Sequence, residues 1–129
     1  MFLYESTITK PPKEKFIVLV YVGPTEADRP LFFFINSNIH PFIRKRPELN
    51  CQQLQISPQE KGHGSLSQDS YIACHETKIE LSVLELNTFG QKKGSLSKRA
   101  IEELCNIVSN SSTISAGEQK LILSAFGKH

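Results

Sequence analysis

The chain has 129 residues, of which 39% are hydrophobic and 22% are charged, and its formal net charge is +2. This length and composition predict one globular domain with its own core, and they exclude a disordered chain. The small net charge means that any nucleic-acid role must depend on a local basic patch.

Three widely spaced cysteines, Cys51, Cys74 and Cys105, are a poor disulfide framework and favour a reducing compartment. The first residues lack the basic start and apolar core of a signal peptide. No apolar run approaches the roughly 18–20 residues of a membrane helix. We therefore expect a cytoplasmic protein without a membrane partner.

Two short apolar runs, residues 16–22 and 31–35, are rich in β-branched and aromatic side chains. Such runs are typical of strands buried on both faces. Gly23 and Pro24 begin the polar connection between the runs. The two runs are therefore expected to form a hairpin with a long loop.

The middle of the chain predicts shorter strands separated by loops. Pro41 interrupts pairing because proline lacks the N–H that a ladder uses. Residues 53–56 alternate between glutamine and aliphatic side chains, which indicates a half-buried strand. Residues 57–67 are expected to be a loop. Residues 70–75 and 78–84 are expected to be two strands joined by a turn.

The last third changes to a helical pattern after a loop at residues 90–94. Ser97 is a suitable N-cap, and apolar residues recur at helical spacing from Ala100 to Val108. A capping box formed by Ser115 and Glu118 predicts the start of a second helix.

The second helix is expected to use Leu121, Ile122, Ala125 and Phe126 as its apolar residues, and Gly127 suits the position after its end. The fold class predicted is mainly β with C-terminal helices (α+β). The chain is expected to be a single domain over residues 1–129, with a strand-rich body at about 1–88 and a helical tail at about 96–127. Closing the sheet into a small barrel would remove its exposed edges.

Several kinds of site are disfavoured by the sequence. Cys74 and His75 are neighbours on a predicted strand and point to opposite faces, and no CxxC or HxxxH pair occurs. We therefore expect no metal and no cofactor, with Cys74 and Cys105 as buried free thiols. The glycines of residues 62–64 lack the context of a phosphate loop and are expected to lie in a mobile loop.

The densest basic cluster is Arg44, Lys45 and Arg46. Further lysines, among them Lys13 and Lys15, precede the first buried run. Cationic side chains bind phosphates, and amide or hydroxyl groups contact the backbone or bases of RNA. The alternative is a solvated charged loop.

Cleavage of RNA by internal transfer needs a base for the 2′-OH, an acid for the leaving oxygen and positive charge for the phosphorane. His40, Lys15, Ser37 and Arg44 have the chemistry for these roles if the fold gathers them. The alternative for His40 is a structural histidine at a strand end.

The order of these features from Lys13 to about Val108 resembles the PemK/MazF family of toxins. The resemblance is carried by Pro12–Val20, Phe34–Ser37, Pro41–Phe42, Gln68–Cys74 and Gly94–Ser97. In that family a basic residue and a proline introduce an apolar strand, and the next strand ends in a catalytically important Thr or Ser. The family's usual catalytic arginine is absent, and its N-terminal strand is not apparent.

The resemblance implies an SH3-like barrel and a metal-independent endoribonuclease that cleaves single-stranded RNA. It implies Ser37 and Lys15 or Lys13 as stabilisers of the transition state, with His40 as the acid or base. Asn36, Lys13, Arg44 and Arg46 would bind the RNA. It also implies a homodimer and an antitoxin protein as partner.

Two other functions remain open at the level of sequence. One is a non-catalytic SH3-like binding module for nucleic acid or a protein partner, since one fold serves many functions. The other is a small subunit of a larger assembly, with the helical tail as its docking face.

Overall fold

The computed structural model describes residues 2–6, 13–22, 30–78, 91–92 and 94–128, with the backbone alone for 2–6, 13–15 and 91–92. Within this part, six strands form one sheet in the order β4-β5-β3-β2-β1-β6, and every neighbouring pair is antiparallel. The strands are β1 (Phe2–Ser6), β2 (Lys13–Tyr21), β3 (Leu31–Asn36), β4 (Gln53–Ile56), β5 (Ser70–Ala73) and β6 (Gln91–Lys92).

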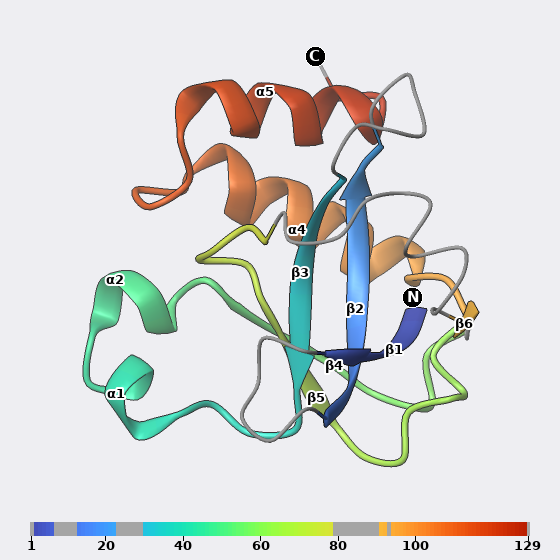
Figure 1. The fold of residues 1–129 in the computed structure, drawn as a ribbon. Coiled ribbons are helices and arrows are strands. Elements are labelled where there is room, and N and C mark those ends of the chain that lie inside the picture. Colours follow the sequence, from blue (N-terminus) through green and yellow to red (C-terminus); the bar gives the residue numbers. More distant parts are fainter. Residues whose placement is uncertain (1, 7–12, 23–29, 79–90, 93, 129) are drawn as a thin grey trace.

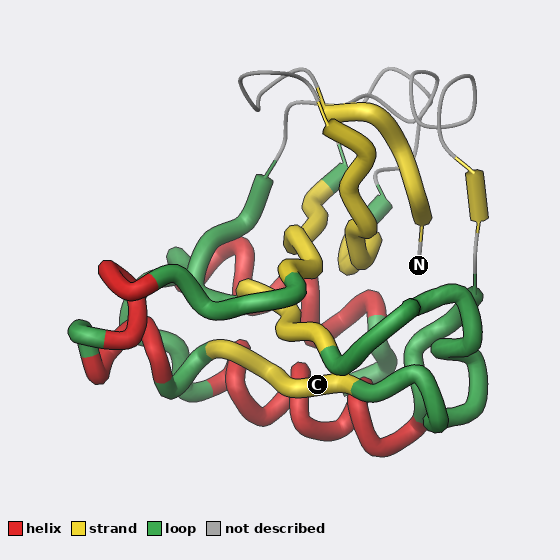
Figure 2. The backbone as a smooth tube through the Cα atoms, turned by 90° about the horizontal axis from the view of Figure 1, so that it is seen from below, coloured by secondary structure: helices red, strands yellow, loops and turns green. Residues whose placement is uncertain are grey.

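Four helices occur in the same described residues: α1 (Pro41–Arg44), α2 (Pro47–Asn50), α4 (Lys98–Ser109) and α5 (Ala116–Ala125). Helices α4 and α5 lie against each other and gather on one side of the strands (Figures 1 and 2). The short helices α1 and α2 lie beside the sheet, away from α5 (Figure 1). No helix in the described part is long and apolar enough to cross a membrane.

The two apolar runs pair with each other, as predicted, and lie at the centre of the sheet. They pair as β2 and β3, with Phe16 opposite Ile35 and Val18 opposite Phe33. Alternate residues point to opposite faces, so one face joins the core beneath α4 and α5, whereas Ile17 and Phe32 are fully buried on the other. Full burial of such side chains contributes about 1.5–3 kcal/mol each.

The predicted helix caps are largely confirmed. The Ser97 hydroxyl accepts a hydrogen bond from the Ala100 N–H at 3.1 Å, and Ser115 caps Glu118 in the same way at 3.2 Å. The capping box is only half formed, because the Glu118 carboxylate accepts from the Thr77 hydroxyl at 2.8 Å instead. That bond ties α5 to the segment after β5.

The C-terminal end of α5 also follows the prediction. Gly127 has a φ of +75°, and the N–H of Lys128 donates to the Leu123 carbonyl at 2.8 Å. This is a Schellman ending, which favours glycine because a side chain there is strained. Of the predicted apolar residues of α5, only Ile122 is fully buried, and Leu121 is 41% exposed.

The expected closure into a barrel is wrong for the described residues, because the sheet is open with β4 and β6 at its edges. Strand β1 was not expected, and β6 lies where a loop was predicted. Strand β1 pairs with both β2 and β6. Pairing between residues far apart in the chain cannot be recognised in a short stretch of sequence, so neither strand was predicted. The predicted strand at 78–84 lies outside the described residues except for Lys78, which bridges to Phe32.

Two short helices follow β3 where the sequence suggested only an interruption. Pro41 and Pro47 occupy the first positions of α1 and α2. A proline is well tolerated there because the first N–H groups of a helix have no partner within the helix. The same feature that breaks a strand therefore starts a helix in this chain.

The loop at residues 57–67 is held in place by a buried histidine. His63 is fully buried, its Nδ1 lies 3.1 Å from the Ser57 carbonyl, and its Nε2 accepts from the Ser97 N–H at 2.9 Å. Because the Ser97 N–H is the donor, the ring proton is on Nδ1 and is directed to Ser57. These contacts of His63 were not part of the prediction, which expected residues 62–64 to lie in a mobile loop.

Gly62 has a φ of +92°, and a Cβ at this position would collide with the backbone carbonyl of Ser95. We predict that Gly62→Ala lowers the free energy of unfolding by about 2–4 kcal/mol, from strain and overpacking together. Gly64→Ala is the matched control, because a Cβ there meets nothing within 4 Å. Urea unfolding of both variants checks this, and equal midpoints would contradict it.

Candidate functional site

A pocket of about 400 Å³ lies where β3 ends. We call it the polar pocket after the amide, hydroxyl and imidazole groups in its lining, although apolar atoms make up most of that lining. It is lined by residues 36–41, Ile43 and Gln53. Three residues selected from the sequence, Asn36, Ser37 and His40, therefore line one pocket. Ser37 and His40 are both exposed. The end of a strand and the start of α1 bring them together.

His40 has a structural role at the edge of the polar pocket. It is the N-cap of α1, and its Nδ1 accepts a hydrogen bond from the Phe42 N–H at 3.1 Å. A ring with an accepting Nδ1 carries its proton on Nε2. In this arrangement the Nε2 of His40 offers a hydrogen-bond donor to a ligand, whereas transferring a proton as an acid or a base would need a different protonation state of the ring.

The predicted cations lie next to the pocket rather than in its lining. Arg44 Nε donates to the carbonyl of Ile39, a lining residue, at 3.3 Å. The guanidinium carbon of Arg46 lies 4.4 Å from the centre of the Phe42 ring. Both arginines are exposed. The basic cluster therefore supplies positive charge at the edge of the polar pocket.

The side chains of Lys13 and Lys15 lie outside what the structure describes, so their predicted roles stay predictions. Their backbone positions are described. Phe16 pairs with Ile35, so the antiparallel register directs Lys15 to the end of the sheet where β3 finishes at Asn36. Lys15 pairs with Tyr4 and Lys13 with Ser6 on β1.

Sequence reasoning missed Gln53 as a site residue. Its Nε2 donates to the Leu49 carbonyl at 3.1 Å and lies 2.8 Å from Nδ1 of His75. Because the amide nitrogen of Gln53 is a donor, Nδ1 of His75 accepts in this contact, and burial is the main cause that lowers the pKa of His75. The glutamine alternation at residues 53–56 could have drawn attention to Gln53, but that signal predicts exposure and not a pocket.

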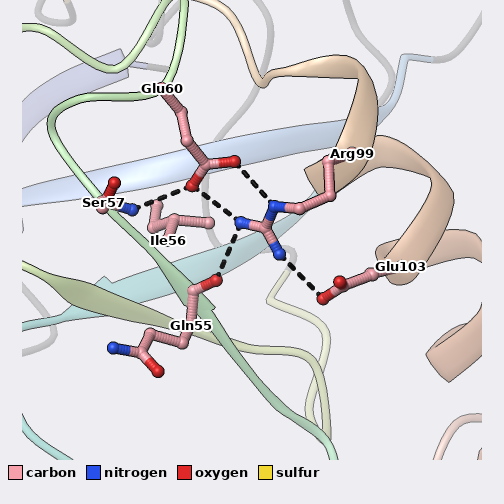
Figure 3. A pocket seen from close by; sticks show the side chains of 6 residues that line it. All are labelled: Gln55, Ile56, Ser57, Glu60, Arg99 and Glu103. Atoms are coloured by element: carbon pink, nitrogen blue, oxygen red, sulfur yellow. Dashed lines mark hydrogen bonds and ion pairs between the residues drawn. The ribbon is translucent and has the colours of Figure 1, made fainter.

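A second pocket, of about 440 Å³, contains an ion-pair network that we call the Glu60–Arg99 cluster. Arg99 donates through Nε and Nη2 to the two carboxylate oxygens of Glu60, each at 2.7 Å. Nη2 also donates to the Gln55 carbonyl at 3.1 Å, and Nη1 lies 2.9 Å from Glu103. Figure 3 shows the guanidinium between the two carboxylates.

The Glu60–Arg99 cluster holds the fold together. Glu60 also accepts from the Ser57 N–H at 3.0 Å and from the Ser97 hydroxyl at 2.8 Å. The hydrogen bonds from Arg99 are the main cause that lowers the pKa of Glu60 to about 2, and the same pairing raises the pKa of Arg99. A carboxylate with such a low pKa and so many donors is a poor general acid or base near neutral pH.

The cysteines and histidines among the described residues are not gathered into a metal site. No group of three or more His, Cys, Asp or Glu residues placed to hold a metal ion occurs in the part that the structure describes. Cys74 and Cys105 are buried free thiols, as predicted, and Cys51 is exposed. Burial raises the pKa of the Cys74 thiol and also that of Cys105, which disfavours the thiolate that a nucleophile needs.

A third pocket, of about 540 Å³, lies along α5. Leu121 and Leu123 line it together with Lys120 and Lys128. This is the helical surface that the sequence suggested as a docking face. Nothing in the described residues occupies it.

Comparison of the chain with models of known protein families, with curated proteins and with solved structures finds no match. The case for a function therefore depends on the residues and geometry of the chain itself, together with the resemblance in the order of its sequence features.

The low pKa of Glu60 leads to a prediction for acid stability. Its folded pKa lies below the ordinary 4.5, so the stabilisation is present above about pH 4.5 and is lost as the pH falls towards 2. We expect Glu60→Gln to lower the free energy of unfolding by about 1–2 kcal/mol at pH 7, and by progressively less towards pH 2.

Urea midpoints measured from pH 2.5 to 7 check this prediction. Glu103→Gln is the control, since Glu103 contacts the same arginine but its side chain is 52% exposed, and we expect a change below about 1 kcal/mol. A constant difference between wild type and Glu60→Gln over the whole pH range would refute the assignment.

Proposed function

We propose that this protein binds single-stranded RNA at the polar pocket and cleaves it without a metal, as a divergent PemK/MazF-like toxin. The observation that carries the proposal is the gathering of Asn36, Ser37 and His40 in one pocket, with Arg44 bonded to its rim. Amide, hydroxyl and imidazole groups next to exposed cations match the needs of an unpaired, charged RNA strand.

The proposed chemistry is internal transfer. The 2′-oxygen of the RNA attacks the neighbouring phosphorus, its proton passes to solvent, and the bond to the 5′-oxygen breaks. As the general acid, His40 acts in its imidazolium form, in which Nδ1 carries a proton and no longer accepts from the Phe42 N–H. It gives its Nε2 proton to the leaving 5′-oxygen and becomes neutral. Ser37 donates to a phosphoryl oxygen, and Arg44 with Lys15 stabilises the charge of the transition state.

The wider proposal follows the family resemblance. The open antiparallel sheet would be a relative of the family's SH3-like barrel, and the protein would act in the cytoplasm as a homodimer inhibited by an antitoxin protein. Lysine in place of the family's arginine supplies charge but not the planar fork, so we expect a slow enzyme.

A specific observation favours a second function, a non-catalytic RNA-binding module. The Nδ1 of His40 is occupied by the Phe42 N–H, as in a purely structural N-cap. In that case the polar pocket and its arginines bind RNA, and no bond is broken.

A substitution at His40 separates the two functions. Asparagine is a good N-cap, so His40→Asn preserves α1 but removes the proton donor. The ribonuclease proposal predicts that this variant binds RNA like wild type and cleaves it about 100-fold or more slowly, the usual contribution of general acid catalysis. The assay follows labelled single-stranded RNA of mixed sequence in the presence of EDTA.

Ser37→Ala and Lys15→Ala are tested in the same assay, and both are expected to slow cleavage. Leu121→Ala, on the distant α5, is the control that should leave cleavage unchanged. Tight RNA binding by wild type without cleavage would support the binding module instead. Absence of both binding and cleavage would reject both functions.

A further inference from the structure

The side chain of Phe42 is exposed to solvent, unlike the phenylalanines at the centre of the sheet. Its side chain is 55% exposed, whereas Phe32 and Phe33 are fully buried in the sheet. Helix α1, which carries Phe42, buries none of its residues. An aromatic ring left in water on a short helix contributes little to the core and is accessible to a partner outside the chain.

One face of the Phe42 ring is covered by Arg46, at 4.4 Å from the ring centre. A guanidinium stacked in this way keeps its N–H groups available at its edges, where they can bind phosphate. The exposed fraction of Phe42 shows that much of the ring remains open to solvent. The pair therefore combines an open aromatic surface with a phosphate-binding cation.

The position of Phe42 connects it to the polar pocket. Its neighbours Pro41 and Ile43 both line the pocket, and its own N–H is bonded to His40. The His40 cap therefore fixes the backbone of Phe42 relative to the pocket.

We infer that Phe42 and Arg46 form a stacking platform for one base of single-stranded RNA, next to a nucleotide held in the polar pocket. This inference rests on the proposed RNA binding and adds the means by which the strand is held. A base stacks on the open face of Phe42, and Arg46 contacts its phosphate. Because every base has an aromatic face, the platform tolerates different sequences.

The first test is the affinity for a fluorescein-labelled 12-mer RNA of mixed sequence, measured by anisotropy in EDTA. Loss of one stacked base predicts that Phe42→Ala binds about 5- to 150-fold more weakly. Phe42→Tyr should bind like wild type because it keeps the ring. Leu121→Ala, which removes another exposed apolar side chain on α5, should have no effect.

A second oligonucleotide separates stacking from charge. An abasic strand keeps its phosphates but has no bases, so Phe42→Ala should bind it as well as wild type does. Arg46→Ala should weaken the binding of both strands and reduce the salt dependence by about one phosphate contact. A loss of equal size for Phe42→Ala on both strands would overturn the stacking role.

A direct readout uses the absence of tryptophan from the chain. Phe42→Trp introduces a single indole, and stacking of a base on it should quench its fluorescence as RNA is added. Wild-type binding of RNA with unchanged affinity in Phe42→Ala, or no quenching in Phe42→Trp, would overturn the platform alone. Failure of wild type to bind any RNA would instead overturn the proposed function.

Discussion

The fold depends on one connection, the attachment of the loop after β4 to the start of α4. His63 accepts from the Ser97 N–H, and Glu60 binds both the Ser97 hydroxyl and Arg99. Local sequence alone would leave this loop loose, because it has no strand or helix of its own. Since α4 covers one face of the sheet with Ala100, Leu104 and Val108, the same connection sets where the core can form. The polar contacts of Glu60 and His63 therefore position the apolar interface between α4 and the sheet. Because the pKa of Glu60 is low, its carboxylate stays charged and keeps these contacts near neutral pH.

A similar arrangement fixes the other end of the helical layer. Gln52 is almost fully buried at the start of β4, donates to Thr113 at 3.0 Å and accepts from Ser111 at 2.6 Å. Buried amides of this kind are stable only when their hydrogen bonds are satisfied. The two networks hold the helices to the sheet from opposite ends of α4. Gln52 also donates to the Glu48 carbonyl at 2.8 Å, so this network includes the backbone of α2. Helix α1 buries none of its residues, which leaves its side chains available for a ligand.

The sequence predicted the parts of the fold whose signals are local. The β-branched run of β2, the alternation in β4 and the serine caps of α4 and α5 are each visible in a short window. It missed β1 and β6, which exist through pairing with distant residues, and it missed the burial of His63, whose partner Ser97 is 34 residues away. Within the site, Ser37 and His40 were found by residue type. Gln53 and Phe42 were not selected, because only the tertiary fold brings Gln53 to the pocket and leaves Phe42 in water.

The division between satisfied and available polar groups is the strongest argument for where function lies. Glu60, Arg99, His63 and Gln52 are engaged in several contacts each, so their chemistry is used to hold the chain. Ser37 and His40 line a pocket in an exposed segment, and Arg46 covers a ring that the core does not need. The Phe42 ring adds little to stability, because much of its apolar surface stays in water. An exposed ring, two exposed arginines and the pocket lined by Ser37 and His40 lie on one short segment, and the proposed binding of a nucleic-acid strand rests on these features together.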